Sequence, residues 1–251
     1  MAAALTIAVV SSLLPTAQRP CLNIHRRTTE FLAPLPMTSD SSLKMGEMST
    51  RTSSNVGKFR VTAARAESGK VSLGFRAPQF ELTEPPSGKS WKLEDFEGYP
   101  ALLVMFICNH CPFVKHLKKD IVKLTNFYMK KGLAVVAISS NSISTHPQDG
   151  PDFMAQEAKA FNYPFPYLYD ESQDVARAFG AVCTPEFFLF KKDGRRPFEL
   201  VYHGQFDDSR PSNNVPVTGR DLSLAIDCVL SGQPVTPAQK PSVGCSIKWH
   251  P

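Results

Sequence analysis

The feature that most constrains this chain is a pair of cysteines placed where an apolar strand pattern changes to a helical one. Residues 101–107 form an unbroken apolar run of strand length, and Cys108-Asn-His-Cys111 follows it directly. Such a run is typical of a strand buried on both faces of a sheet. Pro112 then opens an apolar stripe with helical spacing, made of Leu117, Ile121, Leu124 and Tyr128. The sequence therefore predicts a strand, a Cys-x-x-Cys turn and a helix in direct succession.

Short apolar runs and helical patterns alternate through the rest of the chain, which is typical of an α/β layer fold. We expect further strands at 133–139, 166–169, 186–190 and 200–205, and further helices at 152–161, 173–179 and 221–230. Residues 75–96 predict a hairpin-like lead-in, and the four prolines of residues 234–251 predict an irregular tail. We therefore predict one domain over residues 73–232, with a linker over 64–72 and a C-terminal extension over 233–251.

Residues 1–63 differ in composition from the remainder. They contain 16 Ser/Thr, seven Lys/Arg and three Asp/Glu, and no sustained apolar periodicity follows Leu14. Such a segment cannot bury enough apolar surface to offset the entropy of ordering, so we expect it to be disordered. Acid-poor, Ser-rich and Arg-bearing N-termini are typical of organellar transit peptides. The opening and Val61-Thr-Ala-Ala64 resemble a plastid transit peptide with its processing pattern, which predicts cleavage after Ala63.

We accordingly expect the protein in the chloroplast, with the stroma favoured over the lumen. A secretory signal is the rival interpretation of the apolar stretch 2–14, but no positive charge precedes that stretch. The formal net charge of the whole chain is +5, of which residues 1–63 contribute +4. The other 188 residues carry 21 Lys/Arg and 20 Asp/Glu, so a nucleic-acid partner is not expected. No run of 18 apolar residues occurs, so no membrane span is expected, and the oligomeric state is not predicted.

The cysteines indicate redox chemistry. Cys21 lies in the predicted transit peptide, and five cysteines remain. That count in an intracellular chain favours catalysis or metal binding over a disulfide scaffold. We expect the Cys108 sulfur to lie over the helix N-terminus, where free N–H groups stabilise a thiolate, with Cys111 within bridging reach and His110 adding positive charge. The alternatives are a pair of metal-bound or merely buried thiols.

A second motif lies about 75 residues downstream, where Thr184-Pro185 precedes the apolar strand 186–190. Together with the strand, Cys-x-x-Cys and helix, this combination resembles the thioredoxin superfamily. The lead-in residues 74–80 and 93–98 are similar to its peroxiredoxin-like (AhpC/TSA-like) group, here carrying a Cys-x-x-Cys motif. The resemblance implies a thioredoxin-like fold with a central mixed sheet flanked by helices. It also implies that Pro185 is cis and faces the cysteine pair.

Departures from the neighbouring families narrow the chemistry. A peroxiredoxin has Pro and Thr/Ser before its peroxidatic thiol. When that thiol is aligned on Cys111, this chain has Val104 and Cys108 at those two positions. The position of the usual peroxiredoxin Arg falls near Pro185. Peroxide is therefore poorly polarised, which disfavours peroxidase activity. Leu102 replaces the buried acid of thioredoxin, so no general base is identified. A histidine in the position of His110 occurs in strongly oxidising relatives, so we predict a less reducing potential than that of thioredoxin.

We therefore predict a plastid thiol–disulfide oxidoreductase with Cys108 and Cys111 as catalytic residues. Asn109, His110, Thr184 and Pro185 are expected to tune the pair. Its partners are expected to be protein thiols and disulfides. No Gly-x-Gly-x-x-Gly fingerprint occurs, so we expect no cofactor, no metal and an external, unidentified electron donor.

Two further cysteines are candidate third or resolving thiols. Cys183 lies two residues before Pro185 and is alternatively a small buried hydrophobe, while Cys245 lies in the tail and is alternatively without catalytic importance. Two other function classes stay open. One is a thiol peroxidase with Cys111 as the peroxide-reacting residue. The other is a metal or iron–sulfur module through Cys108, Cys111 and Cys183, with Cys245 as a possible addition.

Overall fold

The structure is a computed structural model that describes residues 65–85 and 87–251 of the 251-residue chain. The predicted transit peptide over residues 1–63, its expected disorder and its cleavage after Ala63 lie outside the described residues. In the part of the chain that is described, no helix is both long enough and apolar enough to cross a membrane.

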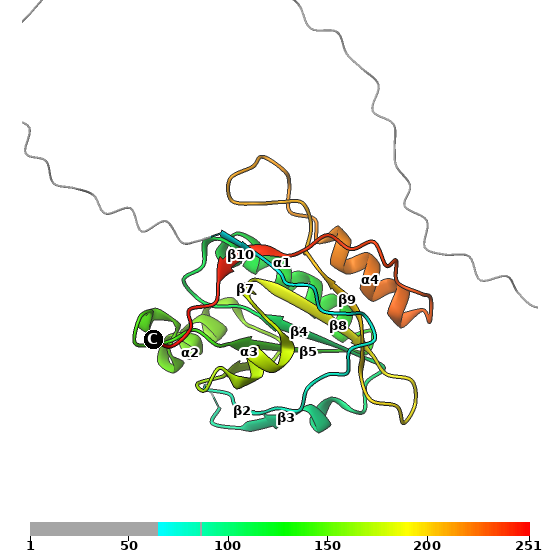
Figure 1. The fold of residues 1–251 in the computed structure, drawn as a ribbon, viewed down its shortest axis with the longest axis horizontal. Helices are drawn as coiled ribbons and strands as arrows, with labels where there is room; N and C mark the ends of the chain where they lie inside the picture. The colour runs from blue at the N-terminus through cyan, green and yellow to red at the C-terminus, as the bar shows by residue number, and fades with distance from the viewer. Residues whose placement is uncertain (1–64, 86) are drawn as a thin grey trace, which may run out of the picture. The chain divides into compact units, whose positions relative to one another are not determined.

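A seven-stranded mixed sheet forms the centre of the domain, in the order β3-β2-β6-β5-β4-β8-β9 (Figure 1). Its strands are β2 (Glu81–Thr83), β3 (Ser90–Lys92), β4 (Ala101–Phe106), β5 (Leu133–Ser139), β6 (Tyr167–Tyr169), β8 (Glu186–Lys191) and β9 (Glu199–Gly204). β4 pairs in parallel with β5 and antiparallel with β8, so the sheet is mixed. Every residue of β4 is buried, as its unbroken apolar run predicts.

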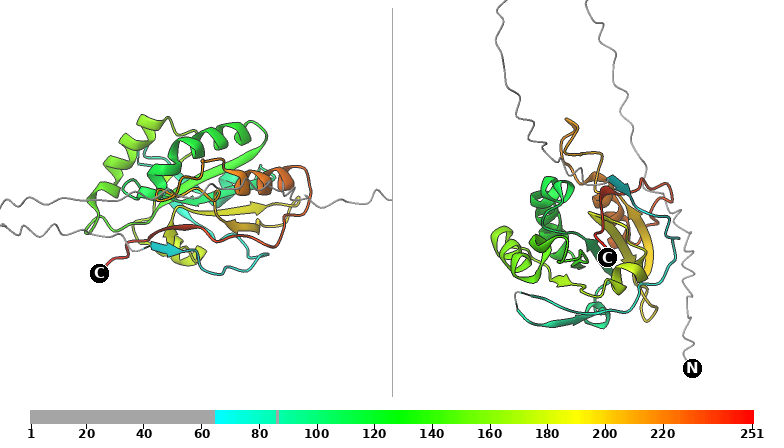
Figure 2. Two further views of the ribbon diagram at one scale, coloured as in Figure 1. Left: turned by 90° about the horizontal axis from the view of Figure 1, so that it is seen from above. Right: turned by 60° about the vertical axis from the view of Figure 1, so that its left-hand side comes forward.

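Helices cover both faces of this sheet (Figure 2). They are α1 (Pro112–Met129), α2 (Pro151–Phe161), α3 (Asp174–Phe179) and α4 (Arg220–Leu230), with short 3₁₀ turns η1 (Leu93–Phe96) and η2 (Pro147–Asp149). α1, α2 and α4 pack into the core on one face, where Leu103 and Met105 of β4 point. α3 and η1 pack against the other face, with Leu102 and Val104. The thioredoxin-like α/β fold that the resemblance implies is thus confirmed.

The expectation of an irregular tail is wrong for its central part. Residues 243–246 form β10 (Val243–Ser246), which lies between β1 (Arg65–Glu67) and β7 (Cys183–Thr184) in a second, three-stranded sheet. Strands of two to four residues are too short to show alternation, and the surrounding prolines mask them in the sequence. β1 lies in the stretch 64–72 that we treat as a linker, so the two flanks of the domain pair with each other (Figure 1).

The residues after β10 are also held by hydrogen bonds. The Ile247 N–H donates to the Val182 carbonyl at 2.9 Å, and the Ser142 N–H donates to the Lys248 carbonyl at 2.8 Å. The His250 N–H donates to the Gln173 side chain at 2.9 Å. The tail therefore lies across the end of the central sheet at which β4 and β5 terminate.

Gly244 lets β10 approach β7 closely, and this predicts a large effect of a small substitution. A Cβ added at Gly244 would lie 1.9 Å from the Thr184 carbonyl oxygen, a backbone atom that cannot move aside freely. We expect Gly244→Ala to lower the free energy of unfolding by at least about 2 kcal/mol. Urea unfolding followed by circular dichroism measures this. The matched control is Gly98→Ala, because a Cβ there meets no atom within 4 Å. Equal effects of the two substitutions would contradict the prediction.

Candidate active site

The two cysteines of the Cys-x-x-Cys motif lie at the junction of β4 and α1, as predicted. Both side chains are buried, with exposed fractions of 2% for Cys108 and 0% for Cys111. The sequence analysis places the first sulfur over the helix N-terminus, but the N-cap residue of α1 is Cys111. Its carbonyl accepts the first helical hydrogen bond from the Lys115 N–H at 2.9 Å. The free N–H groups of the helix end therefore act on Cys111.

Thr184 and Pro185 face this pair from the neighbouring strand. The antiparallel register pairs Phe106 with Glu186, which places the residues before β8 next to those after β4. The Thr184–Pro185 peptide bond is cis, as the resemblance implies. The Thr184 hydroxyl lies 3.3 Å from the Cys108 sulfur, and the Thr184 carbonyl oxygen lies 3.1 Å from the Cys111 sulfur.

A buried carboxylate that the sequence analysis missed holds the residues between the two cysteines. Asp149, in η2, accepts hydrogen bonds from the N–H groups of Asn109 at 2.8 Å and His110 at 3.0 Å. Its other oxygen lies 2.5 Å from the His110 Nδ1 and accepts from the Asn141 amide at 2.9 Å. Asn109 is further fixed, because its side-chain oxygen accepts from the Tyr167 hydroxyl at 3.1 Å. No motif in the sequence marks Asp149, which lies about 40 residues from the pair.

The alternative of a metal module through Cys108, Cys111 and Cys183 is not matched by the group of potential ligands in the described part of the chain. The group of potential ligands is Cys108, His110 and Asp149, whose ligand atoms lie within 4.8 Å of one another. However, the His110 Nδ1 and the nearer Asp149 oxygen are 2.5 Å apart. Two ligands each about 2.1 Å from one zinc ion in a tetrahedral site lie farther apart than this. The arrangement is therefore a hydrogen-bonded His–Asp pair beside a thiol, with the Cys108 sulfur 3.6 Å from the same nitrogen.

The two candidate third thiols, Cys183 and Cys245, lie differently with respect to the cysteine pair. The Cys245 sulfur lies 3.0 Å from the Cys111 sulfur, and the Cys245 side chain is 1% exposed. Cys183 is fully buried, and its sulfur contacts the Pro185 carbonyl oxygen at 4.0 Å. Within residues 65–85 and 87–251, no sulfur lies within hydrogen-bonding distance of the Cys183 sulfur. Cys245 therefore contacts the cysteine pair directly, whereas Cys183 lies in β7, the strand that pairs with β10.

The surroundings of Cys108 and Cys111 change their pKa values differently from what the sequence analysis predicts, which places the stabilised thiolate on Cys108. Burial raises the pKa of Cys108 well above its usual value, and the neighbouring Cys111 and Asp149 raise it further. Hydrogen bonds from Cys108 and then Cys245 hold the pKa of Cys111 well below its usual range, against the opposing effect of burial. The pKa values of the two motif cysteines are therefore shifted in opposite directions, upward for Cys108 and downward for Cys111.

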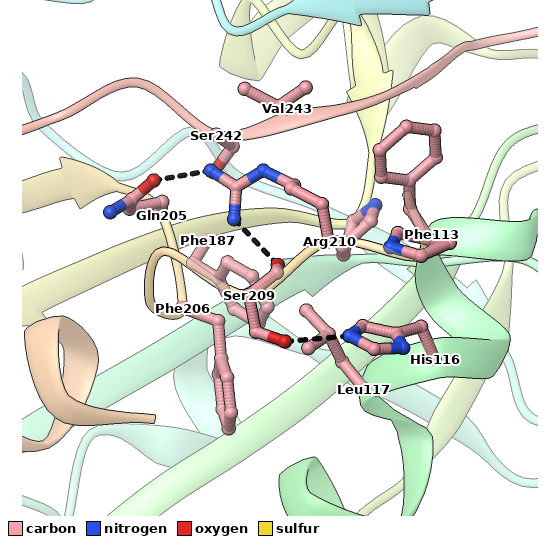
Figure 3. Close-up of a pocket in the computed structure, with 12 residues that line it drawn as sticks. Phe113, His116, Leu117, Phe187, Gln205, Phe206, Ser209, Arg210, Ser242 and Val243 are labelled. Atoms are coloured by element: carbon pink, nitrogen blue, oxygen red, sulfur yellow. Dashed lines mark hydrogen bonds between the residues drawn. The ribbon is translucent and has the colours of Figure 1, made fainter. Parts of the chain in front are cut away.

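A small hollow lies beside Pro185 (Figure 3). Residues from the start of α1, the loop between β9 and α4, and the segment leading into β10 line it: Phe113, His116, Ser209, Arg210, Ser242 and Val243. The Arg210 guanidinium donates to the Ser209 carbonyl at 2.7 Å and to the Gln205 side chain, and the His116 Nε2 lies 2.7 Å from the Ser209 hydroxyl. The hollow thus offers an aromatic wall and a fixed cation to a polypeptide that approaches Pro185.

Comparisons with known proteins agree with this geometry. The model of the AhpC/TSA family matches residues 73–195. The crystal structure of an uncharacterized conserved protein from Geobacillus kaustophilus is similar with a TM-score of 0.73 and 49% identity, covering 76% of this chain and 99% of that one.

Two curated relatives carry names that describe an activity. Thiol-disulfide oxidoreductase ResA from Bacillus thuringiensis subsp. konkukian is 26% identical over 130 residues, which are 50% of this chain and 68% of ResA. Chloroplastic peroxiredoxin Q from Populus jackii is 25% identical over 148 residues, which are 56% of this chain and 64% of that protein. The chain is therefore similar both to an oxidoreductase that acts on disulfides and to a peroxiredoxin.

The Asp149 carboxylate predicts a pH-dependent contribution to stability. Burial raises its pKa, but hydrogen bonds from His110 and Asn141 outweigh burial, so the net pKa lies below the ordinary value. Its stabilisation is therefore present above the unfolded pKa of about 3.9 and is lost as the pH falls through the lower folded value. We expect Asp149→Asn to lower the free energy of unfolding by about 2 kcal/mol at pH 7.

Urea unfolding of both proteins from pH 7 to pH 3 tests this expectation. The difference between wild type and Asp149→Asn should shrink as the pH falls below about 4. Asp152→Asn, at an exposed position early in α2, is the matched control and should change little at any pH. A constant difference across the pH range would show that the charge of Asp149 contributes nothing.

Proposed function

Because a model of the AhpC/TSA family matches residues 73–195 and two buried cysteines meet a cis proline segment, we propose that the chain exchanges a Cys108–Cys111 dithiol with the disulfides of partner proteins. The observation that carries the proposal is the meeting of two buried thiols with a cis-proline segment. The Cys108 sulfur lies 3.3 Å from the Thr184 hydroxyl, and Cys111 is the N-cap residue of α1. The protein is then an oxidoreductase whose chemistry needs no bound cofactor.

The proposed reaction begins with Cys108, which borders the half-buried Asn109 and His110. The proton of the Cys108 thiol moves to the Cys111 sulfur, whose pKa is lowered by its neighbours. The Cys108 thiolate then attacks one sulfur of the partner disulfide, and the other partner sulfur leaves as a thiolate that takes a proton. Cys111 next loses its proton and attacks Cys108. A protein disulfide forms and the partner leaves with both sulfurs reduced.

The tuning residues of the motif have separate parts in this proposal. Asn109 and His110 are held by Asp149 through their backbone N–H groups, which fixes the turn between the two sulfurs. Thr184 supplies a hydroxyl to Cys108 and a carbonyl acceptor to a protonated Cys111. Pro185 borders the hollow of Figure 3, where a partner segment would lie. An external protein donor would return the electrons.

The location and partners complete the proposal. The composition of residues 1–63 favours plastid import, and the similarity to a chloroplastic peroxiredoxin Q agrees with it. The substrates would be protein thiols and disulfides of the stroma. A fluorescent fusion of the full chain tests the location. If the fusion stays outside the plastid, the proposed location is wrong, and the proposed reaction is unaffected.

One observation favours a second candidate function, a thiol peroxidase. The low pKa of Cys111 gives it the thiolate that attacks a peroxide. Against this, Cys111 is fully buried, and in the described part of the chain no arginine hydrogen-bonds to it. Arg210 instead lies across the hollow beside Pro185. The disulfide reaction is therefore favoured.

Single-cysteine variants test which cysteine attacks. We expect Cys108→Ser to lose disulfide reductase turnover by on the order of a thousandfold, because the attacking sulfur is gone. Cys111→Ser should instead stop after the first step and accumulate a mixed disulfide at Cys108, visible by intact mass. Insulin reduction with dithiothreitol as the donor measures turnover. Cys183→Ser is the matched control, since Cys183 is equally buried and should keep near wild-type turnover.

The same variants separate the two functions. Rapid consumption of hydrogen peroxide that survives in Cys108→Ser and disappears in Cys111→Ser would identify Cys111 as the peroxide-reacting cysteine. That result would replace the disulfide exchange proposed here with peroxidase chemistry.

The reduction potential gives a further test. The reduced form is stabilised by the hydrogen bonds that Cys111 receives, and stabilising the thiolate makes a disulfide more oxidising. We expect a potential above the value of about −270 mV of ordinary thioredoxin. An equilibrium titration against glutathione measures it, and a thioredoxin-like value would contradict the expectation.

A further inference from the structure

A third thiol lies in contact with the active-site pair. Cys245 in β10 places its sulfur 3.0 Å from the sulfur of Cys111. Both side chains are buried, at 1% and 0% exposed. The Cys111 sulfur thus has one thiol neighbour from its own motif and one from the tail, and both contribute to its lowered pKa.

The position of Cys245 is set by the backbone on both sides of β10. Cys245 is paired with Thr184 of β7 and with Arg65 of β1, so the strand cannot shift without breaking two ladders. Gly244, the preceding residue, brings the strand so close to Thr184 that a Cβ would lie 1.9 Å from its carbonyl oxygen. The Ser242 hydroxyl donates to the Gly204 carbonyl at 2.8 Å and anchors the start of the strand. The approach of the two sulfurs is thus a fixed feature of the fold.

We propose that Cys245 is a third redox-active thiol, which exchanges with the Cys108–Cys111 disulfide to give a Cys111–Cys245 disulfide. This inference rests on the proposed function, because that reaction supplies the starting disulfide. In the exchange, the Cys245 thiol loses its proton and its sulfur bonds to the Cys111 sulfur. The Cys108–Cys111 bond breaks, and Cys108 leaves as a thiolate that takes up a proton. One disulfide is consumed and one is formed, so no further oxidant or reductant is needed.

The surroundings of the three sulfurs suit this step. A disulfide bond measures about 2.05 Å, so the Cys111 and Cys245 sulfurs need to close by about 1 Å. The leaving Cys108 sulfur has the Thr184 hydroxyl at 3.3 Å, which is able to donate a hydrogen bond to a thiolate, and the ring of His110 at 3.6 Å, whose Nδ1 is paired with Asp149. The contact with Cys111 is the largest cause of the raised pKa of Cys245. That cause ends once Cys111 is in a disulfide and carries no charge.

The exchange would give the oxidised protein two disulfide isomers. In one, Cys108 is bonded beside the half-buried Asn109 and His110 at the rim of the site. In the other, the bond lies between the N-cap of α1 and β10, the middle strand of the three-stranded sheet, and Cys108 is a free thiol. A reductant would reach the second isomer more slowly, because β1 and β7 flank β10 on both sides.

Disulfide mapping tests the proposal directly. Reduced wild type, Cys108→Ser and Cys183→Ser are treated with diamide, a small oxidant that joins neighbouring thiols, then quenched in acid and mapped by peptide mass spectrometry. We expect wild type and Cys183→Ser to contain both the Cys108–Cys111 and the Cys111–Cys245 bonds. Cys108→Ser should contain the Cys111–Cys245 bond. Cys183→Ser is the matched control, because Cys183 is equally buried on the strand next to Cys245.

The outcomes separate this inference from the proposed function. A Cys108–Cys111 bond in wild type, with no Cys111–Cys245 bond in either wild type or Cys108→Ser, would overturn the third thiol and leave the proposed function standing. Absence of the Cys108–Cys111 bond in oxidised wild type would overturn the proposed function itself. The wild-type result does not depend on the folding of any variant.

A kinetic measurement adds a second readout. Reduction of the oxidised protein by dithiothreitol, followed by intrinsic fluorescence, should show a fast and a slow phase in wild type and in Cys183→Ser. The slow phase should be lost in both Cys245→Ser and Cys245→Ala, provided that their circular dichroism matches wild type. A slow phase that persists in these folded variants would overturn the proposal.

Discussion

The antiparallel pairing of β4 with β8 decides where the reactive groups of this protein meet. Its register places Phe106 opposite Glu186. The two segments that extend past this pair, Cys108 on one strand and Thr184 on the other, must then lie side by side. The helix that follows β4 turns its N-terminus onto the second cysteine. A shift of one residue in this register would point the alternating side chains of β8 into the wrong cores, so burial on both faces fixes the site.

Two buried carboxylates then hold the two sides of the site. Asp149 accepts from the backbone of Asn109 and His110 on the Cys-x-x-Cys side. Glu186 accepts from the N–H of Cys183 at 3.0 Å on the other side, and its second oxygen lies 2.7 Å from His203. A charge buried in a protein interior is costly unless its hydrogen-bonding capacity is filled. Both carboxylates meet that condition by accepting hydrogen bonds from the backbone of the reactive segments. The same hydrogen bonds therefore stabilise the buried carboxylates and hold the site rigid.

The sequence predicted the parts of this site that lie close together along the chain, but not the contacts between residues that are far apart in it. The apolar run, the Cys-x-x-Cys turn and the helical stripe are contiguous, so their pattern predicted β4 and α1, and the resemblance added the cis Pro185. Asp149 and Cys245 act across about 40 and 134 residues, through a short turn and a four-residue strand. Elements of that length carry no periodicity, and only the closed fold shows which backbone they approach.

The three sulfurs form a chain with Cys111 in the middle. Cys108 precedes it in the same turn, the Cys245 sulfur lies 3.0 Å from its sulfur, and its pKa is lowered by both neighbours. Each disulfide argued for this site therefore contains Cys111, whichever neighbour is its partner. In the proposed reactions the two cysteines of the motif have unequal roles, because Cys108 attacks the partner and Cys111 takes part in both disulfides. The pairing of β10 with β7 holds Cys245 beside Cys111, in an environment as buried as that of the motif itself.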